Sequence, residues 1–416
     1  MTQVAPQALT RFPAYRAARL LGVMGPALFR YLSLFESDLA GWERAHARTA
    51  GGFAGLGSDL GGLYVKLCQV AGARADVFPP VFVRELARFH DRVSPRPFGE
   101  LRPALERDLG APLDRVFARF DATPLAAASL AQVHRAQLHD GADVAVKIQY
   151  PDAARLFGTD LANVRRGARL AARLFPRFPL RSAIEEVADF IALELDFARE
   201  AESLARVADA LKDDLDVRVP RLYGDLCRPR LLVMEYLDGV PVHDLARLRA
   251  AGTDLGALAD RLARLYRRMI FEHGFFHGDP HPGNLLLLRD GRIGLLDFGL
   301  AKSLPPGFGA ELARMFGAAL SQDGDLALRH ARALGFQLDG VAPAEFLRAL
   351  GIALGAKHDL LEVRELIFSG LGDGVPRDVA LVVRTLILLN GLSERLAPGE
   401  RRIARELFAG AIAAIR

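Results

Sequence analysis

Residues 277–284 read His-Gly-Asp-Pro-His-Pro-Gly-Asn, and residues 297–299 read Asp-Phe-Gly. The two motifs supply an acid, Asp279, an amide, Asn284, and a second carboxylate, Asp297. Kinase-type phosphoryl transfer needs such a set, because one carboxylate orients the attacking hydroxyl while an Asn and an Asp hold Mg²⁺ against the phosphates. The motifs therefore predict a catalytic Asp279, with Asn284 and Asp297 as metal ligands.

The sequence between the two motifs predicts a β-hairpin. Residues 285–288 and 292–296 are short apolar runs, and Arg289-Asp290-Gly291 between them is a turn sequence. Such a hairpin would place both metal ligands on one side of a cleft. The alternative interpretation is that each motif is only a common turn former.

A metal site made by His277, Asp279 and His281 is a further alternative. Pro280 and Pro282 disfavour it, because they prevent the helix that would put residues four apart on one face.

The composition of the 416-residue chain is that of an ordinary globular protein: 51% of its residues are hydrophobic and 25% are charged. The net charge of +4 is too small to indicate nucleic-acid binding. The two cysteines, Cys68 and Cys227, form no disulfide framework, so we expect a reducing, cytoplasmic location. The most apolar stretch, 379–392, contains Arg384 and Asn390 and is too short to span a membrane.

The pattern along the chain predicts three parts: a helical N-terminal extension over 1–112, a β-rich N-lobe over 113–237 and a helical C-lobe over 238–416. Glycine-dense residues 51–62 predict a hinge or linker. Residues 117–148 alternate short apolar runs with turns and predict strands, as does 230–236. Helices are predicted at 152–175, 182–211, 255–272, 309–321, 326–334 and 343–355, with two more toward the C-terminus.

Lys147 lies on the predicted strand Val144-Ala145-Val146-Lys147-Ile148, at the position whose lysine pairs with the α- and β-phosphates in kinases. The chain has only 5 lysines against 49 arginines, so a lysine here indicates that a compact ammonium is needed. The alternative is an ordinary lysine on the solvent side of a strand.

Glu194, Asp196 and Glu200 fall on the predicted helix 182–211, where Asp196 and Glu200 would share a face. We expect Glu200 to pair with Lys147, as the helical glutamate of kinases does. A solvated charged helix face is the alternative.

No glycine-rich loop precedes Lys147. Its place is taken by residues 125–132, which include Ala126, Ala127, Ala128 and Ser129. Backbone N–H groups beside small side chains can still approach phosphates, although alanine disfavours the positive φ that glycine allows. At 234–237 we expect a hinge in which the backbone groups of Glu235 and Leu237 bind adenine, or else a plain core strand.

With these motifs the chain resembles the UbiB family, the aarF-domain-containing atypical kinase-like proteins linked to coenzyme Q and other prenyl-quinone lipids. The resemblance rests on three elements: the alanine loop at 126–129, Lys66-Leu67-Cys68-Gln69 as the Lys-x-Gly-Gln element, and Glu194-Leu195-Asp196 as the Glu-x-Asp pair. Two residues depart from the family pattern, because Cys68 and Ala131 stand where glycine is usual.

The resemblance implies an α+β, two-lobed protein-kinase-like fold with the N-terminal helical extension packed over the active-site cleft. In that arrangement Lys66 and Gln69 would engage the carboxylates of Glu194 and Asp196, where a peptide substrate would otherwise dock. It also implies ATP or ADP with Mg²⁺ as cofactors, a prenyl-lipid or phenolic small molecule as partner and, together with the basic N-terminus, peripheral membrane contact.

No Ala-Pro-Glu follows Asp297-Phe298-Gly299, which disfavours protein kinase activity. The first hypothesis is an ATP-Mg-dependent atypical kinase or ATPase. One alternative is an antibiotic- or choline-type phosphotransferase, which the alanine loop and the Lys66–Gln69 element disfavour. The other is a nucleotide-gated scaffold without turnover.

Overall fold

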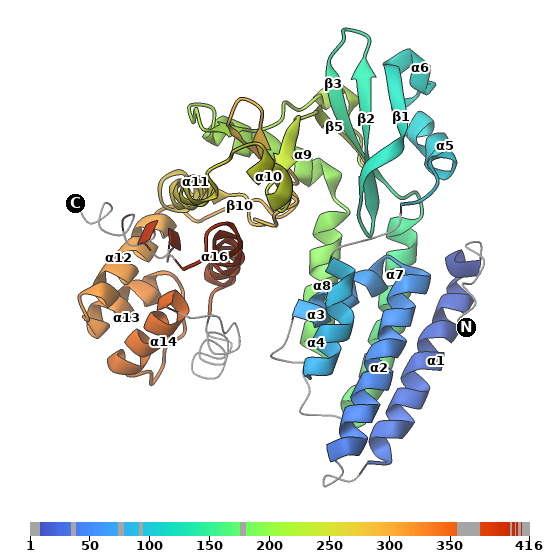
Figure 1. Ribbon diagram of the computed structural model, residues 1–416. Helices are drawn as coiled ribbons and strands as arrows, with labels where there is room; N and C mark the ends of the chain where they lie inside the picture. Colours follow the sequence, from blue (N-terminus) through green and yellow to red (C-terminus); the bar gives the residue numbers. More distant parts are fainter. Residues whose placement is uncertain are drawn as a thin grey trace. The chain divides into compact units, whose positions relative to one another are not determined.

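The computed structural model describes residues 9–34, 39–73, 79–90, 95–174, 180–355 and 375–399, together with 402, 403, 405, 406 and 409. The chain divides into two units (Figure 1). Unit 1 comprises Met1–Ala198 and Tyr223–Glu235, and unit 2 comprises Arg199–Leu222 and Tyr236–Arg416. The three-part division at residues 112 and 237 stays a prediction.

Unit 1 opens with helices. They are η1 (Leu9–Arg11), α1 (Pro13–Leu32), α2 (Leu39–Leu60), α3 (Leu63–Ala73), α4 (Pro80–Leu86), η2 (Ala87–His90), α5 (Phe98–Leu109) and α6 (Leu113–Val116). The linker predicted over 51–62 is wrong, because α2 continues to Leu60. Two of its glycines lie where neighbouring side chains approach: an added Cβ would come within 2.9 Å of Val23 at Gly52 and within 2.9 Å of the Phe89 ring at Gly57. Only Gly61 and Gly62, both at positive φ, break the helix.

A four-stranded antiparallel sheet in the order β1-β2-β3-β5 completes the N-lobe of unit 1. Its strands are β1 (Phe117–Ala127), β2 (Ala131–Leu138), β3 (Asp143–Gln149) and β5 (Leu231–Glu235). The strands predicted in these regions are therefore confirmed. Val144 and Val146 on β3 are fully buried and share one hydrophobic core with Leu56 and Tyr64 of the N-terminal helices. The extension and the sheet are thus joined by a common core.

The single helix predicted over 182–211 is wrong. After α7 (Ala153–Leu174), the chain forms α8 (Leu180–Glu194) and then α9 (Phe197–Ala210), separated by Leu195 and Asp196. The side-chain amide of Gln149 on β3 donates a hydrogen bond of 2.9 Å to the carbonyl of Leu195, which satisfies a backbone group at the break. Asp196 and Glu200 therefore do not share one continuous helix face.

Unit 2 holds a second small sheet in the order β4-β9-β8-β6. Its strands are β4 (Val217–Arg218), β6 (Gly239–Pro241), β8 (Leu285–Leu288) and β9 (Ile293–Leu295), and a separate pair joins β7 (Phe275–Phe276) to β10 (Lys302–Ser303). The hairpin predicted between the two motifs is confirmed, because β8 and β9 pair antiparallel around Gly291 at positive φ. The strands missed from sequence are two or three residues long and carry no periodic pattern.

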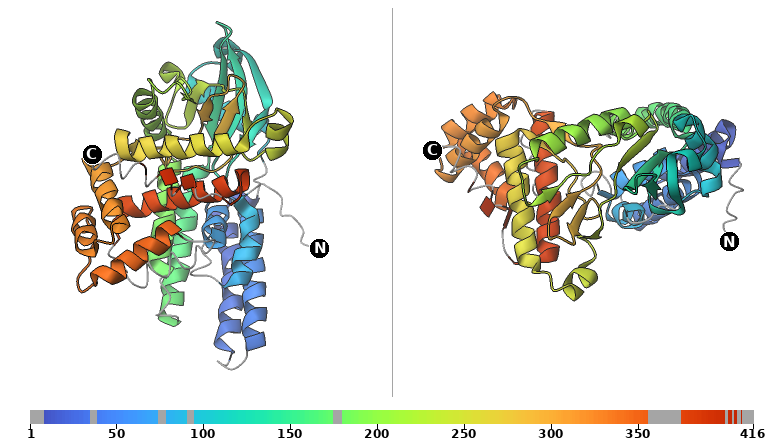
Figure 2. Two further views of the ribbon diagram at one scale, coloured as in Figure 1. Left: turned by 60° about the vertical axis from the view of Figure 1, so that its left-hand side comes forward. Right: turned by 90° about the horizontal axis from the view of Figure 1, so that it is seen from above.

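The rest of unit 2 is helical, and Figure 2 shows α11 and α16 side by side. These helices are α10 (Leu245–Ala250), α11 (Leu255–Arg268), a π-helix η4 (Met269–His273), α12 (Phe308–Leu320), α13 (Gly324–Ala333), α14 (Pro343–Gly355) and α16 (Arg377–Leu396). The short helix η3 (Gly224–Leu226) belongs to unit 1. One of the two helices predicted toward the C-terminus is α16, and most of the remaining C-terminal residues lie outside the described part of the chain. In the described part of the chain, no helix combines the length and apolarity needed to cross a bilayer.

Candidate nucleotide and metal site

The motif at 277–284 begins with a histidine that holds the loop in place. His277 is fully buried after the short strand β7. Its Nε2 lies 2.7 Å from the carbonyl oxygen of Leu296, which can only accept, so Nε2 carries a proton. Its Nδ1 lies 3.2 Å from the Tyr266 hydroxyl, and its ring packs edge-on against Phe298. Because both ring nitrogens have protein partners, His277 has a structural role that leaves no nitrogen for a metal.

Gly278 is required by the backbone at this point. Its φ is +54°, and a Cβ added there would lie 2.1 Å from the carbonyl oxygen of Leu300. The Gly278 carbonyl in turn accepts a hydrogen bond of 3.2 Å from the buried hydroxyl of Thr385 on α16. A helix more than one hundred residues downstream therefore helps to fix the loop that presents Asp279.

Asp279 and Asn284 are brought together at the foot of the β8–β9 hairpin. The Asn284 amide nitrogen donates to the Asp279 carboxylate at 2.9 Å. The backbone N–H of Leu296 donates to the carbonyl of Asn284 at 2.8 Å, so Asn284 lies opposite the residue that precedes Asp297. Burial, and then the charge of Asp279, raise the pKa of the Tyr266 hydroxyl well above its ordinary value, which keeps that hydroxyl neutral.

Asp297 and Glu200 approach each other around Gly299. Asp297 has a φ of +60°, an uncommon conformation for a residue other than glycine that often marks functional sites. A Cβ built on Gly299 would lie 3.4 Å from Asp297 Oδ1 and 4.0 Å from the buried Glu200 Oε2. Arg199 donates to the Gly299 carbonyl at 3.2 Å, which ties the first turn of α9 to the Asp-Phe-Gly motif.

The position of Glu200 beside Gly299 was not predicted from sequence. The prediction placed Glu200 on one long helix over 182–211 and paired it with Lys147 of the strand. The break at 195–196 instead places Glu200 in the first turn of α9. No periodic signal in the sequence marks that break.

The oxygen donors of this unit fit Mg²⁺. Carboxylates and amide oxygens are ligands that Mg²⁺ accepts, and it binds through one or two carboxylates plus substrate phosphates. Within the described residues, no group of three or more His, Cys, Asp or Glu side chains is arranged for a metal. Binding of Mg²⁺ by Asn284 and Asp297, together with the phosphates of a nucleotide, stays a prediction.

Lys147 lies in the middle of the unit 1 sheet, paired with Val133 on one side and Leu232 on the other. Its ammonium lies 5.2 Å from the ring centroid of Phe197, the first residue of α9. Lys147 belongs to unit 1 and Glu200 to unit 2, and their pairing stays a prediction.

The alanine loop is shorter than predicted. Ala126 and Ala127 belong to β1, where they pair with Val133 and Gln132, so that only 128–130 separate β1 from β2. None of the residues 125–132 has a positive φ, which is why alanine is tolerated. The contribution of Ala126, Ala127, Ala128 and Ser129 to phosphate binding stays a prediction.

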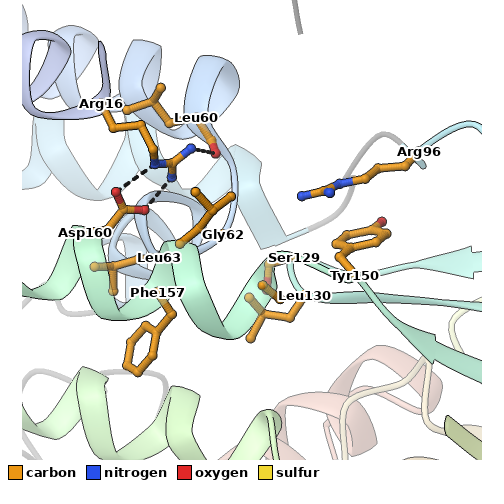
Figure 3. Close-up of a pocket in the computed structure, with 12 residues that line it drawn as sticks. Arg16, Leu60, Gly62, Leu63, Arg96, Ser129, Leu130, Tyr150, Phe157 and Asp160 are labelled. Atoms are coloured by element: carbon orange, nitrogen blue, oxygen red, sulfur yellow. Dashed lines mark hydrogen bonds and ion pairs between the residues drawn. The ribbon is translucent and has the colours of Figure 1, made fainter. Parts of the chain in front are cut away.

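Ser129 lines a small cavity within unit 1 (Figure 3). Leu60, Gly62 and Leu63, at the turn between α2 and α3, line the same cavity. The buried ion pair of Arg16 and Asp160 lines it as well. The tip of the alanine loop therefore lies against the N-terminal helices.

The predicted adenine hinge falls at the junction of the two units, between Glu235 and Tyr236. Glu235 ends β5 opposite Val144, and Leu237 is buried with Leu286 and Leu288 in unit 2. Binding of adenine by this segment stays a prediction.

The Lys-x-Gly-Gln element lies on α3. Lys66 forms an ion pair with Glu194 at the end of α8, and its ammonium lies 4.3 Å from the centroid of the Phe190 ring. The Gln69 amide donates to the carbonyl of Phe89 at 2.9 Å. Asp196 is exposed in the break between α8 and α9. The predicted lid roles of Lys66, Gln69, Glu194 and Asp196 stay predictions.

Cys68 fits the position where the family has glycine. Its side chain is buried, its Sγ lies 3.4 Å from the carbonyl of Phe53, and the space it needs is left by Gly57 on α2. Burial raises the pKa of the Cys68 thiol to about 12, so the side chain acts as a small apolar group.

Comparison with known proteins identifies the family of this chain. The sequence profile of the ABC1 atypical kinase-like domain matches residues 88–331. The chain belongs to this family. The resemblance to UbiB and aarF-domain proteins and the two-lobed, kinase-like α+β fold are confirmed. The match begins after α4, so it does not include the helix that carries Lys66 and Gln69.

Several relatives cover most of this ABC1 kinase-like chain. The AarF domain-containing kinase 1 of Drosophila melanogaster is 36% identical over 82% of this chain and 70% of its own length. The AarF domain-containing protein kinase 1 of Xenopus laevis is 31% identical over 85% and 72%. The probable protein kinase UbiB of Azotobacter vinelandii is 38% identical over 64% and 51%.

A solved structure is also similar to this protein. Rv3197 of Mycobacterium tuberculosis, determined as a complex with erythromycin, covers 87% of this chain and 95% of its own, with 26% identity and a TM-score of 0.60.

Proposed function

We propose that the protein binds ATP with Mg²⁺ and acts as an atypical kinase-like phosphotransferase or ATPase in prenyl-quinone or related lipid metabolism. The observation that carries this proposal is the arrangement in unit 2. There, Asp279 and Asn284 are hydrogen-bonded at the foot of the hairpin, and Asp297 and Glu200 approach each other around Gly299.

Each residue has a role in that reaction. Asp279 orients the acceptor hydroxyl, or a water molecule, and receives the proton of that group. The oxygen of the acceptor forms a bond to the γ-phosphorus while the bond between the γ-phosphorus and ADP breaks. Asn284 and Asp297 would hold Mg²⁺, which neutralises charge on the phosphates. Lys147 on β3 would bind the α- and β-phosphates, held by Glu200.

A small-molecule or lipid acceptor is favoured over a protein acceptor. The helix α12 begins nine residues after Gly299, which leaves no long loop on which a peptide could lie. The Lys66–Glu194 ion pair fastens the N-terminal extension to the end of α8. A prenyl-lipid or a phenolic compound is the acceptor class that the resemblance to the UbiB family implies.

A second candidate is phosphorylation of an antibiotic hydroxyl. The specific observation in its favour is the similar Mycobacterium tuberculosis protein, whose structure contains erythromycin. Mass spectrometry of erythromycin incubated with the protein and ATP would detect a phosphorylated product if this candidate is correct.

ATP hydrolysis by the purified protein tests the proposal. We expect Asp279→Asn to lower the rate by about 100-fold or more, because it removes the general base. Asp290→Asn is the matched control, since Asp290 is exposed in the turn of the same hairpin, and this variant should keep the wild-type rate. The assay is run with and without anionic vesicles and quinone-like phenols.

Stimulation of the wild-type rate by phenols, but not by erythromycin, would support the lipid acceptor. Equal rates for wild type and Asp279→Asn would exclude catalysis by this site and leave only a nucleotide-gated scaffold.

A further inference from the structure

Helix α16, drawn in red beside α11 in Figure 2, contacts both chain segments that carry the motifs of the candidate site. In its first turn, Asp378 forms an ion pair with Lys302, three residues after Gly299. Two turns later, the buried Thr385 hydroxyl donates a hydrogen bond of 3.2 Å to the carbonyl of Gly278. Residues seven apart lie on the same side of a helix, so one face of α16 touches both segments.

The two segments also contact each other at the same place. The strand β10 pairs with β7, with Lys302 opposite Phe276. Leu300 packs so closely on Gly278 that a Cβ added to the glycine would lie 2.1 Å from the Leu300 carbonyl oxygen. The two segments and α16 therefore contact one another in all three pairings, and all of them belong to unit 2.

The position of the ion pair is more informative than its strength. The Lys302 and Asp378 side chains are 37% and 24% exposed, and a pair with that much access to water stabilises the folded chain only slightly. The pair nevertheless joins residues 76 positions apart, and it uses one of only 5 lysines in the chain to hold the short strand that follows Asp-Phe-Gly. Its effect on the reaction would therefore come from the geometry of that strand rather than from overall stability.

We propose that α16 is a clamp for the candidate site, in which Asp378, Lys302 and Thr385 are positioning residues. The clamp holds the segment after Asp-Phe-Gly against the loop that presents Asp279, so that Asp279 and Asp297 keep the separation that phosphoryl transfer requires. The inference rests on the proposed function and extends it to a helix beyond residue 331, where the family match ends. The alternative is an ion pair that only ties two surface elements together.

Steady-state ATP hydrolysis by the full chain distinguishes these two roles. Lys302→Met and Asp378→Asn each remove the ion pair, and we expect each to lower kcat about fivefold or more, because the strand is no longer held in place. The affinity for MgATP in calorimetry should stay within about twofold of wild type, because neither residue belongs to the proposed nucleotide site. The charge-swapped double variant, Lys302→Asp with Asp378→Lys, should recover most of kcat.

Arg314→Met is the matched control. Arg314 pairs with Glu311 on α12, with side chains 47% and 27% exposed, so this ion pair has a similar exposure but links residues of one helix. The control should lose as little stability in urea as Lys302→Met and should keep the wild-type kcat. An equal loss of kcat in the two variants, or no loss in Lys302→Met, would overturn the inference.

A double-mutant cycle tests whether both ends of α16 act on the same contact. If they do, Lys302→Met combined with Thr385→Val should lower kcat by less than the product of the two single effects, because the first change already loosens what the second one holds. A full product would show that the two residues act independently, which contradicts a common clamp.

Hydrogen exchange without nucleotide tests the clamp independently of turnover. Loss of the ion pair should speed exchange in residues 300–304 and also in 275–279, while α12 and the unit 1 sheet keep their wild-type rates. Unchanged exchange in 275–279 would overturn the inference, because the pair would then not hold the two segments together. If the wild-type protein does not hydrolyse ATP, the proposed function fails, and these exchange rates alone decide whether the clamp exists.

Discussion

At the scale of single residues, the geometry around Asp279 depends on the preceding residue, Gly278. The motif contains this glycine, but the sequence does not explain why a glycine is needed there. Gly278 combines a positive φ with a backbone contact that no side chain could fit. The motif predicts which residue is the acid. Only the structure shows that Leu300, which follows the second motif, forces the glycine.

Gly278→Ala should therefore destabilise the protein by about 3 kcal/mol or more, because it adds a clash to the strain of positive φ. Gly274→Ala is the control: Gly274 has a φ of +60° with no atom within 4 Å of an added Cβ, so this change should cost only about 1 kcal/mol. Chemical denaturation measures both. Equal losses would show that the contact with Leu300 is unimportant.

Cys68 shows what the sequence could not predict at this scale. Because the family pattern has glycine at this position, the larger side chain of Cys68 suggests that too little space is left between α3 and the helix that faces it. In the structure, Gly57 on the facing helix provides the space. The compensation lies eleven residues away on another helix, where a single sequence gives no sign of the contact.

At the scale of elements, helix α16 supports the catalytic loop through one hydroxyl. The Thr385 hydroxyl lies within hydrogen-bond distance of the carbonyls of Gly278 and Leu381. Thr385→Val should lower the free energy of unfolding by about 1 kcal/mol, because a buried carbonyl loses a donor, and should lower ATP turnover by up to about 100-fold.

Thr385→Ser keeps the donor and should restore both the stability and the rate. Loss of stability without any loss of turnover in Thr385→Val would show that the hydrogen bond does not position Asp279.

The strand β2 should make stability depend on pH through His134. This side chain is fully buried between Phe98 and Phe120, and burial lowers its pKa below the ordinary value of 6.5. The unfolded chain therefore binds a proton below about pH 6.5 that the folded chain does not. The free energy of unfolding should fall as the pH drops through this window, by at most about 1.4 kcal/mol per pH unit for this group.

His134→Gln should flatten that pH dependence, measured by denaturation in urea between neutral and mildly acidic pH. His139→Gln, at an exposed histidine of the next turn, is the control. An unchanged slope in His134→Gln would show that other groups, such as His46, account for the whole effect.

The helices and strands also show which parts of the fold could be predicted from the sequence. Most long helices and the strands of the N-lobe were predicted correctly, because their apolar periodicity is strong. The break between α8 and α9 was missed because its cause is tertiary: Gln149, on a distant strand, satisfies the Leu195 carbonyl. The helix through 51–60 was missed because glycine has a low helix propensity, whereas Gly52 and Gly57 lie where facing side chains approach closely.

At the scale of the whole molecule, the motifs predicted the kinase-like class correctly, since their order along the chain is specific. The groups expected to meet at the nucleotide lie in two units: Lys147 in one, and Asp279, Asn284, Asp297 and Glu200 in the other. Nucleotide binding by these groups is the central claim of the proposed function.

Titration calorimetry with ATP and ADP, with and without Mg²⁺, tests that claim most directly. We predict saturable binding to wild type that requires Mg²⁺, loss of the Mg²⁺ dependence in Asp297→Asn, and weaker binding in Lys147→Met. Asn also tolerates the left-handed backbone at position 297, so the first variant removes only the charge. No heat with either nucleotide in the presence of Mg²⁺, and no effect of Lys147→Met, would contradict the account.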